Sequence, residues 1–122
     1  MLLPTMIVAV GLVIMGLVAL AKPIAIVGFF DGTAETVNAR NEIRAVYGGF
    51  GVCLGMLVLL ASFLIPHHAV GIYIAVGVAL AGMALGRVIS AIIEVPSFWP
   101  WFFFGVETIA ALMMFSVVID SI

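Results

Sequence analysis

The hydrophobic positions of the chain fall into four long runs, and the polar positions gather at a few places between them. The runs cover about residues 2–21, 43–65, 69–93 and 98–119. Each has about 20 residues, the length of a helix that crosses the hydrocarbon core of a bilayer. Strands are not expected, because a membrane barrel requires alternating apolar and polar positions. The pattern predicts an all-α integral membrane protein, an antiparallel bundle of four transmembrane helices with short loops.

The connection between the first and second runs, residues 22–42, is too long for a simple turn. Asp31 or Thr33 is a good N-cap for a short helix within it, which we expect to lie at the membrane interface. The residues before Lys22 read Ala-Leu-Ala, which imitates a signal-peptidase site. No basic segment precedes the first run, so we expect the first helix to be retained. No internal repeat is present, and we expect one domain over residues 1–122.

Composition supports a membrane location. The chain is 66% hydrophobic and 8% charged, and its mean hydropathy is +1.45. A soluble domain is about half apolar and about a quarter charged, so this chain has too much apolar surface for a small water-soluble core. The net charge is -2 and no basic run exists, so nucleic acid is not an expected partner.

Charge at the ends of the runs predicts the orientation. Lys22, Arg40 and Arg44 lie in or beside the 22–42 connection, whereas the opposite side has no Lys or Arg and carries His67, His68 and Asp120. Basic residues favour the cytoplasm. We therefore expect a multi-pass protein of the bacterial inner membrane, with the 22–42 connection cytoplasmic and both termini on the opposite side.

Small residues along the second run predict close helix packing. Gly48, Gly51 and Gly55 follow Arg44 at i+4, i+7 and i+11, so all four lie on one helical stripe. Glycines let a second helix approach closely, which predicts that Arg44 faces the bundle. Another small-residue motif at Gly82 and Gly86 is expected to pack helices. Four further glycines are expected to face lipid and contact partner proteins: Gly11, Gly16, Gly71 and Gly77.

Two charges lie within the last two runs. Arg87 precedes Pro96 by nine residues and Glu107 follows Pro100 by seven, which places them roughly 13 Å and 10 Å from the same turn. Because an unpaired charge inside a bilayer is costly, we expect Arg44, Arg87 and Glu107 to form a network. Four polar residues complete this candidate site nearer its rim: Asn41, Glu42, Tyr47 and Glu94.

Three interpretations of this cluster stay open. It fixes the helix register, it binds a ligand, or some of its side chains extend to water without meeting. Trp99 and Trp101 lie in an aromatic segment, residues 96–105, that is typical of an interfacial belt. A pocket lined by Trp99, Trp101 and Phe102 for a flat apolar ligand is the alternative. No catalytic motif and no metal-binding motif is present, and we predict neither an enzyme nor a metal or cofactor site.

The motifs in the second, third and fourth runs resemble a known family. The segments "NEIRAVYGGFGVCLG" and "GMALGRVIS", followed by Glu107, are similar to small bacterial four-helix membrane proteins catalogued only as a domain of unknown function. The resemblance covers about residues 22–114 and implies a four-helix bundle without an assigned activity. The arginine and glycines of the second run also resemble small scaffold proteins of sterol synthesis. Small multidrug transporters share the helix number, but the acid that they carry in the first span is absent.

Two functions from different classes are compatible with these features. The first is a non-enzymatic accessory or scaffold subunit of a larger membrane complex, with membrane lipid and other integral membrane subunits as partners. The second is a small binder or carrier of a lipid-like or quinone-like ligand, whose polar head would contact the arginines and Glu107. A proton pathway through Glu107 is less favoured, because no relay of acids follows it.

Overall fold

The computed structural model describes residues 2–122, which are almost entirely helical and contain no strand. Four helices are long and apolar enough to cross a membrane, and the predicted all-α class is confirmed. They are α1 (Leu3–Ala21), a continuous helix over Val37–Phe63, α5 (Ala69–Ile93) and α6 (Phe98–Ser121). The protein is therefore a multi-pass membrane protein.

Shorter elements make up the second long helix and the connections. The second helix consists of α3 (Val37–Ile43), a π-helical turn η2 (Arg44–Gly49) and α4 (Phe50–Phe63). The first connection holds α2 (Pro23–Val27) and the 3-10 turn η1 (Gly28–Phe30). A second 3-10 turn, η3 (Pro66–His68), joins α4 to α5.

The second helix begins at Val37, earlier than the apolar pattern predicts. Thr36 is its N-cap, since its side-chain oxygen accepts a hydrogen bond from the Ala39 amide at 3.0 Å. The prediction of Asp31 or Thr33 as the N-cap is wrong. The polar residues after Thr36 belong to the first turns of the long helix, and the short helix in the connection is α2.

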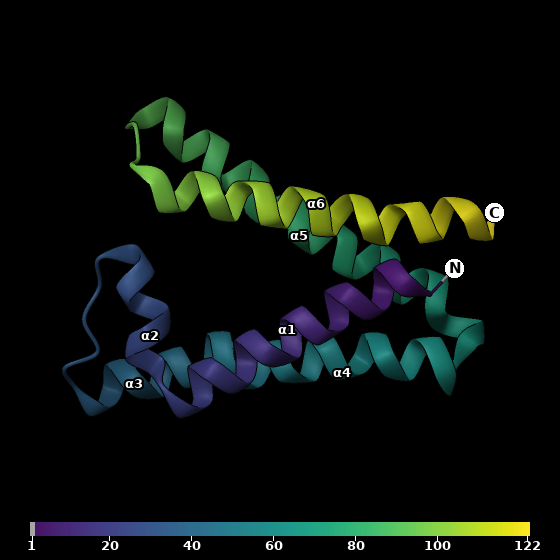
Figure 1. Cartoon of the computed structure of the whole chain (residues 1–122), viewed down its shortest axis with the longest axis horizontal. Helices are drawn as coiled ribbons and strands as arrows, with labels where there is room; N and C mark the ends of the chain where they lie inside the picture. The colour runs from purple at the N-terminus through teal and green to yellow at the C-terminus, as the bar shows by residue number, and fades with distance from the viewer. Residues whose placement is uncertain (1) are drawn as a thin grey trace.

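The four long helices form two antiparallel pairs. In Figure 1, α1 lies along the second long helix in the lower pair, and α5 lies along α6 in the upper pair. The two pairs contact each other less extensively, through α1 with α6 and α4 with α5. Both termini lie at the same end of the bundle, and the connection containing α2 lies at the other.

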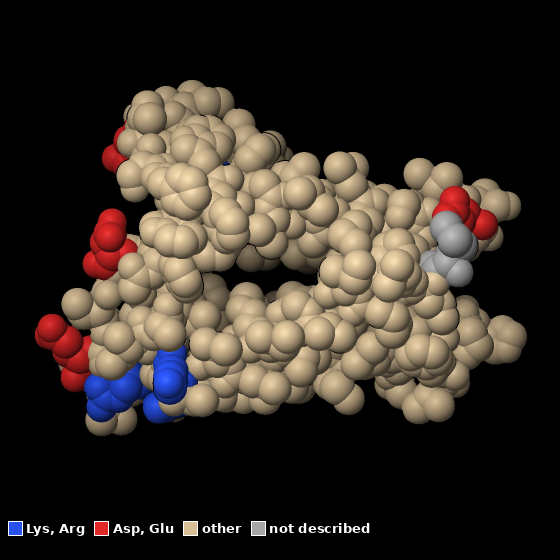
Figure 2. Space-filling model, viewed as in Figure 1, with Lys and Arg blue, Asp and Glu red and all other residues tan. Residues whose placement is uncertain are grey.

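The buried apolar core occupies only the half of the bundle nearer the termini. Its members come from the first part of α1, the end of α4, the first part of α5 and the second part of α6. They are Val8, Ala9, Val58, Ala61, Ala69, Tyr73, Val76, Leu80, Ala111, Met114, Val117 and Val118. Between this core and the connection the pairs separate, and Figure 2 shows an opening between them that is closed again at the connection end. The polar side chains of the candidate site lie in this more open half.

Glycines set the close approach within the first pair. A Cβ atom on Gly55 would lie 2.7 Å from the Ala9 carbonyl oxygen, and one on Gly51 would lie 3.3 Å from the Gly16 Cα. A Cβ atom on Gly48 would lie 2.8 Å from the Leu20 side chain. The glycine stripe of the second helix therefore faces α1, as its spacing predicts.

Two glycines expected to face lipid are in fact packed inside the bundle. A Cβ atom on Gly16 would lie 2.6 Å from the Val52 amide nitrogen, and one on Gly77 would lie 2.8 Å from the Phe115 ring. Gly11 and Gly71 are open, with no atom within 4 Å of a built Cβ. The sequence marks places of close approach but does not say whether the approaching helix belongs to the same chain.

Candidate functional site

An ion pair joins α5 to α6 within the membrane-spanning region. The Arg87 Nε donates a hydrogen bond to the Glu107 Oε1. The Glu107 side chain is only 7% exposed and the Arg87 side chain is 23% exposed. It is the only ion pair between side chains of residues 2–122. Their distances along the sequence from the turn between α5 and α6 predict similar depths for Arg87 and Glu107, and the structure brings the two side chains together.

Phe103 supports the arginine from one side. Its ring lies one helical turn before Glu107 on α6, and the guanidinium carbon of Arg87 is 5.5 Å from the ring centroid. Sequence reasoning missed this contact. The i, i+4 spacing of Phe103 and Glu107 was the available signal, because residues so spaced lie on one helix face. The ring holds the cation beside the carboxylate in a setting with little water.

A pocket of about 370 Å³ opens beside the ion pair. Its walls come from α5, α6 and the loop between them, and they combine the two charged residues with small and apolar ones. The lining residues are Met83, Gly86, Arg87, Ser90, Pro96, Pro100 and Glu107. Because Met83, Gly86 and Ser90 are exposed, the pocket opens onto the outer surface of the α5–α6 pair.

Two buried polar atoms at this site have no partner in residues 2–122. They are the Glu107 Oε2 and the hydroxyl oxygen of the adjacent Thr108. An unsatisfied acceptor is expensive in a low-dielectric interior, and a carboxylate oxygen more so than a neutral one. The ion pair therefore retains capacity for a hydrogen-bond donor.

Arg44 does not join this pair, and the predicted network of three residues is wrong in that respect. Its Nε donates to the Leu20 carbonyl oxygen at 3.0 Å, at the end of α1 in the other helix pair. Gly48 also packs against Leu20, so Arg44 and the glycine stripe both face α1, which belongs to the other helix pair. Arg44 instead satisfies a carbonyl that the end of α1 leaves unpaired.

The remaining predicted rim residues lie apart from the ion pair. Tyr47 stacks on Phe30 of η1 with ring centroids 6.1 Å apart. Asn41, Glu42 and Glu94 are exposed, and neither acid forms an ion pair with another described residue. The polar site therefore consists of Arg87 and Glu107, without the other polar residues grouped with them.

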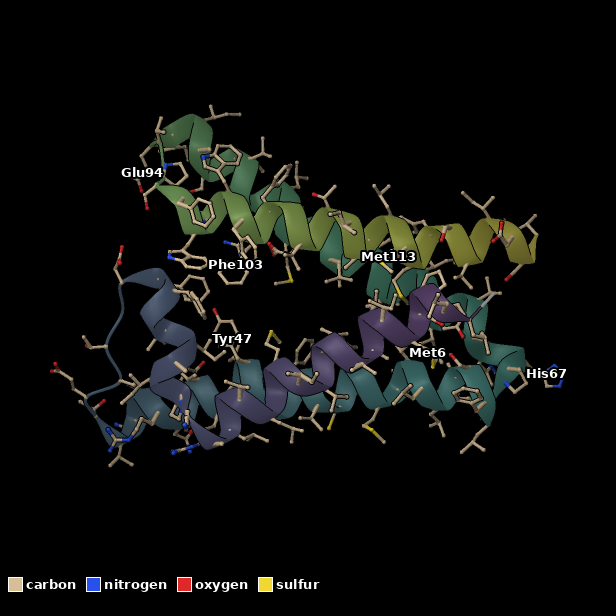
Figure 3. All side chains as sticks on the ribbon, viewed as in Figure 1. Met6, Tyr47, His67, Glu94, Phe103 and Met113 are labelled. Carbon is tan, nitrogen blue, oxygen red and sulfur yellow. The ribbon has the colours of Figure 1, made fainter. Side chains whose placement is uncertain are left out.

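Aromatic side chains connect the two helix pairs at the connection end of the bundle. Phe30 contacts Phe103 at 5.8 Å between centroids as well as Tyr47, and Figure 3 shows Tyr47 and Phe103 on opposite sides of the gap. Trp99 packs edge-on against Phe29 of η1 at 4.8 Å. Trp101 contacts Phe104 at 5.8 Å and is exposed. The structure thus places Trp99 in a contact between η1 and α6, and neither tryptophan is among the residues that line the pocket.

Gly82 and Gly86 are not packed against any described helix. A Cβ atom on either would have no neighbour within 4 Å, so the predicted packing within the chain is absent. Residues 2–122 contain no group of three His, Cys, Asp or Glu side chains able to hold a metal ion.

The fold and the ion pair can be compared with known proteins. Residues 3–118 match the family described as a domain of unknown function (DUF4345). The chain belongs to this family. No curated protein and no solved structure was found to match it. The DUF4345 match spans all four membrane helices and includes both Arg87 and Glu107.

Proposed function

We propose that this DUF4345 protein is a non-enzymatic accessory or scaffold subunit that binds a helix of another integral membrane protein through α5. The observation that supports this most is an exposed row of small residues along the whole of α5, which no described residue covers. The row comprises Gly71, Ala75, Ala79, Gly82, Gly86 and Ser90. We call it the α5 small-residue face.

Close helix approach is the usual use of such a row in a membrane. The same chain uses Gly48, Gly51 and Gly55 in this way against α1. On α5 the three glycines have no atom within 4 Å of a built Cβ, and large side chains such as Val78 and Leu85 flank the row. A transmembrane helix with a complementary apolar surface fits between those flanks.

A different protein is favoured over a second copy of this chain. Two parallel copies packed through Gly86 would bring their Arg87 side chains close together, because Arg87 is adjacent in sequence and partly exposed. Like charges repel strongly at low dielectric. An uncharged helix avoids this repulsion and leaves each Arg87 with its own Glu107.

Affinity purification of the tagged chain from native membranes in mild detergent tests the proposal. A larger protein should accompany the chain in fixed stoichiometry and should be lost from the Gly82→Leu variant. Gly11→Leu is the matched control, because Gly11 is equally open but lies on α1. A monomer from native membranes, or a Gly82→Leu variant that keeps its partner, would contradict the proposal.

The proposed location is the bacterial inner membrane, with the 22–42 connection in the cytoplasm. Support comes from Lys22, Arg40 and Arg44, which lie at the connection end of the bundle. The other end carries His67, His68 and Asp120 and no Lys or Arg.

A second candidate function is binding of a lipid-like or quinol-like molecule that carries a hydroxyl group. The unpartnered Glu107 Oε2 favours it, since that oxygen accepts a hydrogen bond while the Arg87 guanidinium has N–H groups left to donate. A hydroxyl group both donates and accepts, whereas a phosphate would be repelled by the carboxylate. Mass spectrometry of an organic extract of the purified protein should show one enriched hydroxyl-bearing amphiphile, absent from Arg87→Met/Glu107→Met. An extract no different from bulk lipid would rule this function out.

A further inference from the structure

A larger pocket, of about 530 Å³, lies where α1 ends and meets α2 and the second long helix. Its lining consists of Ala21, Lys22, Pro23, Ile24, Ala25, Arg40 and Arg44. The chain has only four Lys and Arg residues, and three of them stand around this one pocket. Figure 2 shows their blue surfaces gathered at the connection end of the lower helix pair. We call it the basic pocket.

Backbone carbonyl groups orient the two arginines. The Arg44 Nε donates to the Leu20 carbonyl oxygen at 3.0 Å, and the Arg40 Nη1 donates to the Ala34 carbonyl oxygen at 2.7 Å. A guanidinium group has five N–H donors, and each of these arginines uses one in a bond to a described residue. Both groups are therefore held in place while most of their donors stay available.

The cations of the basic pocket have no acidic partner within the pocket, although Asp31, Glu35 and Glu42 are exposed at the same end of the bundle. No acidic residue lines the pocket, and no Asp or Glu among residues 2–122 forms an ion pair with Lys22, Arg40 or Arg44. The C-terminal end of α1 contributes the equivalent of roughly half a negative charge. Three cations exceed that, so the pocket attracts an anion.

The remaining lining residues identify the kind of anion. Ala21, Pro23 and Ile24 give the pocket an apolar wall, and Ile24 is 64% exposed. The pocket also lies at the end of a membrane-spanning helix, at the level where lipid phosphates are found. A free phosphate ion would gain nothing from the apolar wall, whereas the glycerol and acyl chains of a lipid would cover it.

We propose that the basic pocket binds the head group of an anionic phospholipid, with the phosphate between Lys22, Arg40 and Arg44. The lipid's chains then lie along the exposed surface of α1 and α2. Clusters of basic residues at the ends of membrane helices are suited to this role. The site is separate from the α5 small-residue face and from the Arg87–Glu107 ion pair, and it does not depend on either proposed function.

Native mass spectrometry of the full chain in mild detergent is the direct test. The probes are phosphatidylglycerol and phosphatidylcholine with identical acyl chains, offered together. The parent protein should retain phosphatidylglycerol preferentially. Each loss of one positive charge should reduce this preference about fivefold, and the variant Lys22→Gln/Arg40→Gln/Arg44→Gln should lose it.

Two further variants separate a built site from general surface charge. Lys22→Arg keeps the charge and should keep the preference. Glu35→Gln/Glu42→Gln removes exposed acids from the same end of the molecule, outside the pocket, and should not reduce the preference. Lys22→Gln also serves if the triple variant does not fold, because the Lys22 side chain forms no hydrogen bond with a described residue.

Three results would overturn the proposal. The parent protein binds the two lipids equally, the variants that remove positive charge keep the preference, or the acid-to-amide control lowers it as much as the pocket variants do. Inorganic phosphate is a separate arm of the experiment. If it displaces phosphatidylglycerol at a similar concentration, the pocket recognises free phosphate and the assignment to a lipid is wrong.

Discussion

Removing one charge from the Arg87–Glu107 pair should destabilise the protein, by an amount that depends on which charge remains. In Glu107→Gln the orphaned arginine is 23% exposed and keeps the Phe103 ring 5.5 Å away. An uncompensated buried charge costs about 3–5 kcal/mol, and this variant should lie near the lower value. In Arg87→Met the orphaned carboxylate is 7% exposed, so the loss should lie near the upper value.

The double variant Arg87→Met/Glu107→Gln should be milder than the sum of the two single variants. Once neither charge remains, neither is orphaned, and replacing a buried ion pair by uncharged groups is often nearly neutral. We expect a coupling energy of about 2–3 kcal/mol, at the upper end for residues in direct contact. The free energy of unfolding should be measured for all four proteins in mixed detergent micelles, with helical circular dichroism as the signal.

A matched cycle with Arg44 provides the control. Arg44 donates to the Leu20 carbonyl oxygen in the other helix pair, so Arg44→Met and Glu107→Gln should be additive within about 0.5 kcal/mol. Additivity of the Arg87 cycle would show that the ion pair does not contribute as a unit. Coupling in the Arg44 cycle would restore the network of three charges and refute the separation described above.

Three further predictions follow from the packing, the proposed topology and the helix start. Gly51→Leu should lower the free energy of unfolding by about 1–3 kcal/mol, because the larger side chain overpacks against α1. Gly11→Leu should not lower it, because Gly11 is open. Equal melting of the two variant proteins would mean that Gly51 faces lipid. An impermeant thiol reagent applied to intact spheroplasts should label a cysteine at Asp120 and not one at Glu35, and the reverse pattern would invert the topology. Thr36→Ala should destabilise the second helix by about 1 kcal/mol, and faster amide hydrogen exchange confined to its first turn is the expected readout.

The membrane helices were predictable because each apolar run is continuous and ends at a strong local signal. Pro23 after Lys22 stops α1, and the Lys22 backbone leaves the helical region there, with φ −137° and ψ 75°. The Arg87–Glu107 pair was predictable for a related reason. Both residues lie at counted distances from one short turn, so an antiparallel arrangement brings them to the same depth.

The failures have a common physical cause: local sequence does not specify which helix faces which. Arg44 enters the membrane from the same side as Arg87 and Glu107, which predicts that it joins them, but its side chain reaches α1 in the other helix pair. Gly11 and Gly16 lie in the same apolar run of α1. Yet Gly16 is packed against the Val52 amide and Gly11 is open. The partner of a small residue is decided by long-range packing that a periodic pattern does not contain.

The confinement of the core to one half of the bundle has a consequence for the surrounding bilayer. Where the helices touch, the protein displaces a compact area of lipid, and where the two pairs separate it displaces a broader one. The protein is therefore wedge-shaped, and its wide end is on the side of the 22–42 connection. A wedge-shaped protein fits best where the leaflet around its wide end is stretched by curvature. We therefore expect membrane curvature to affect where this bundle is accommodated most easily.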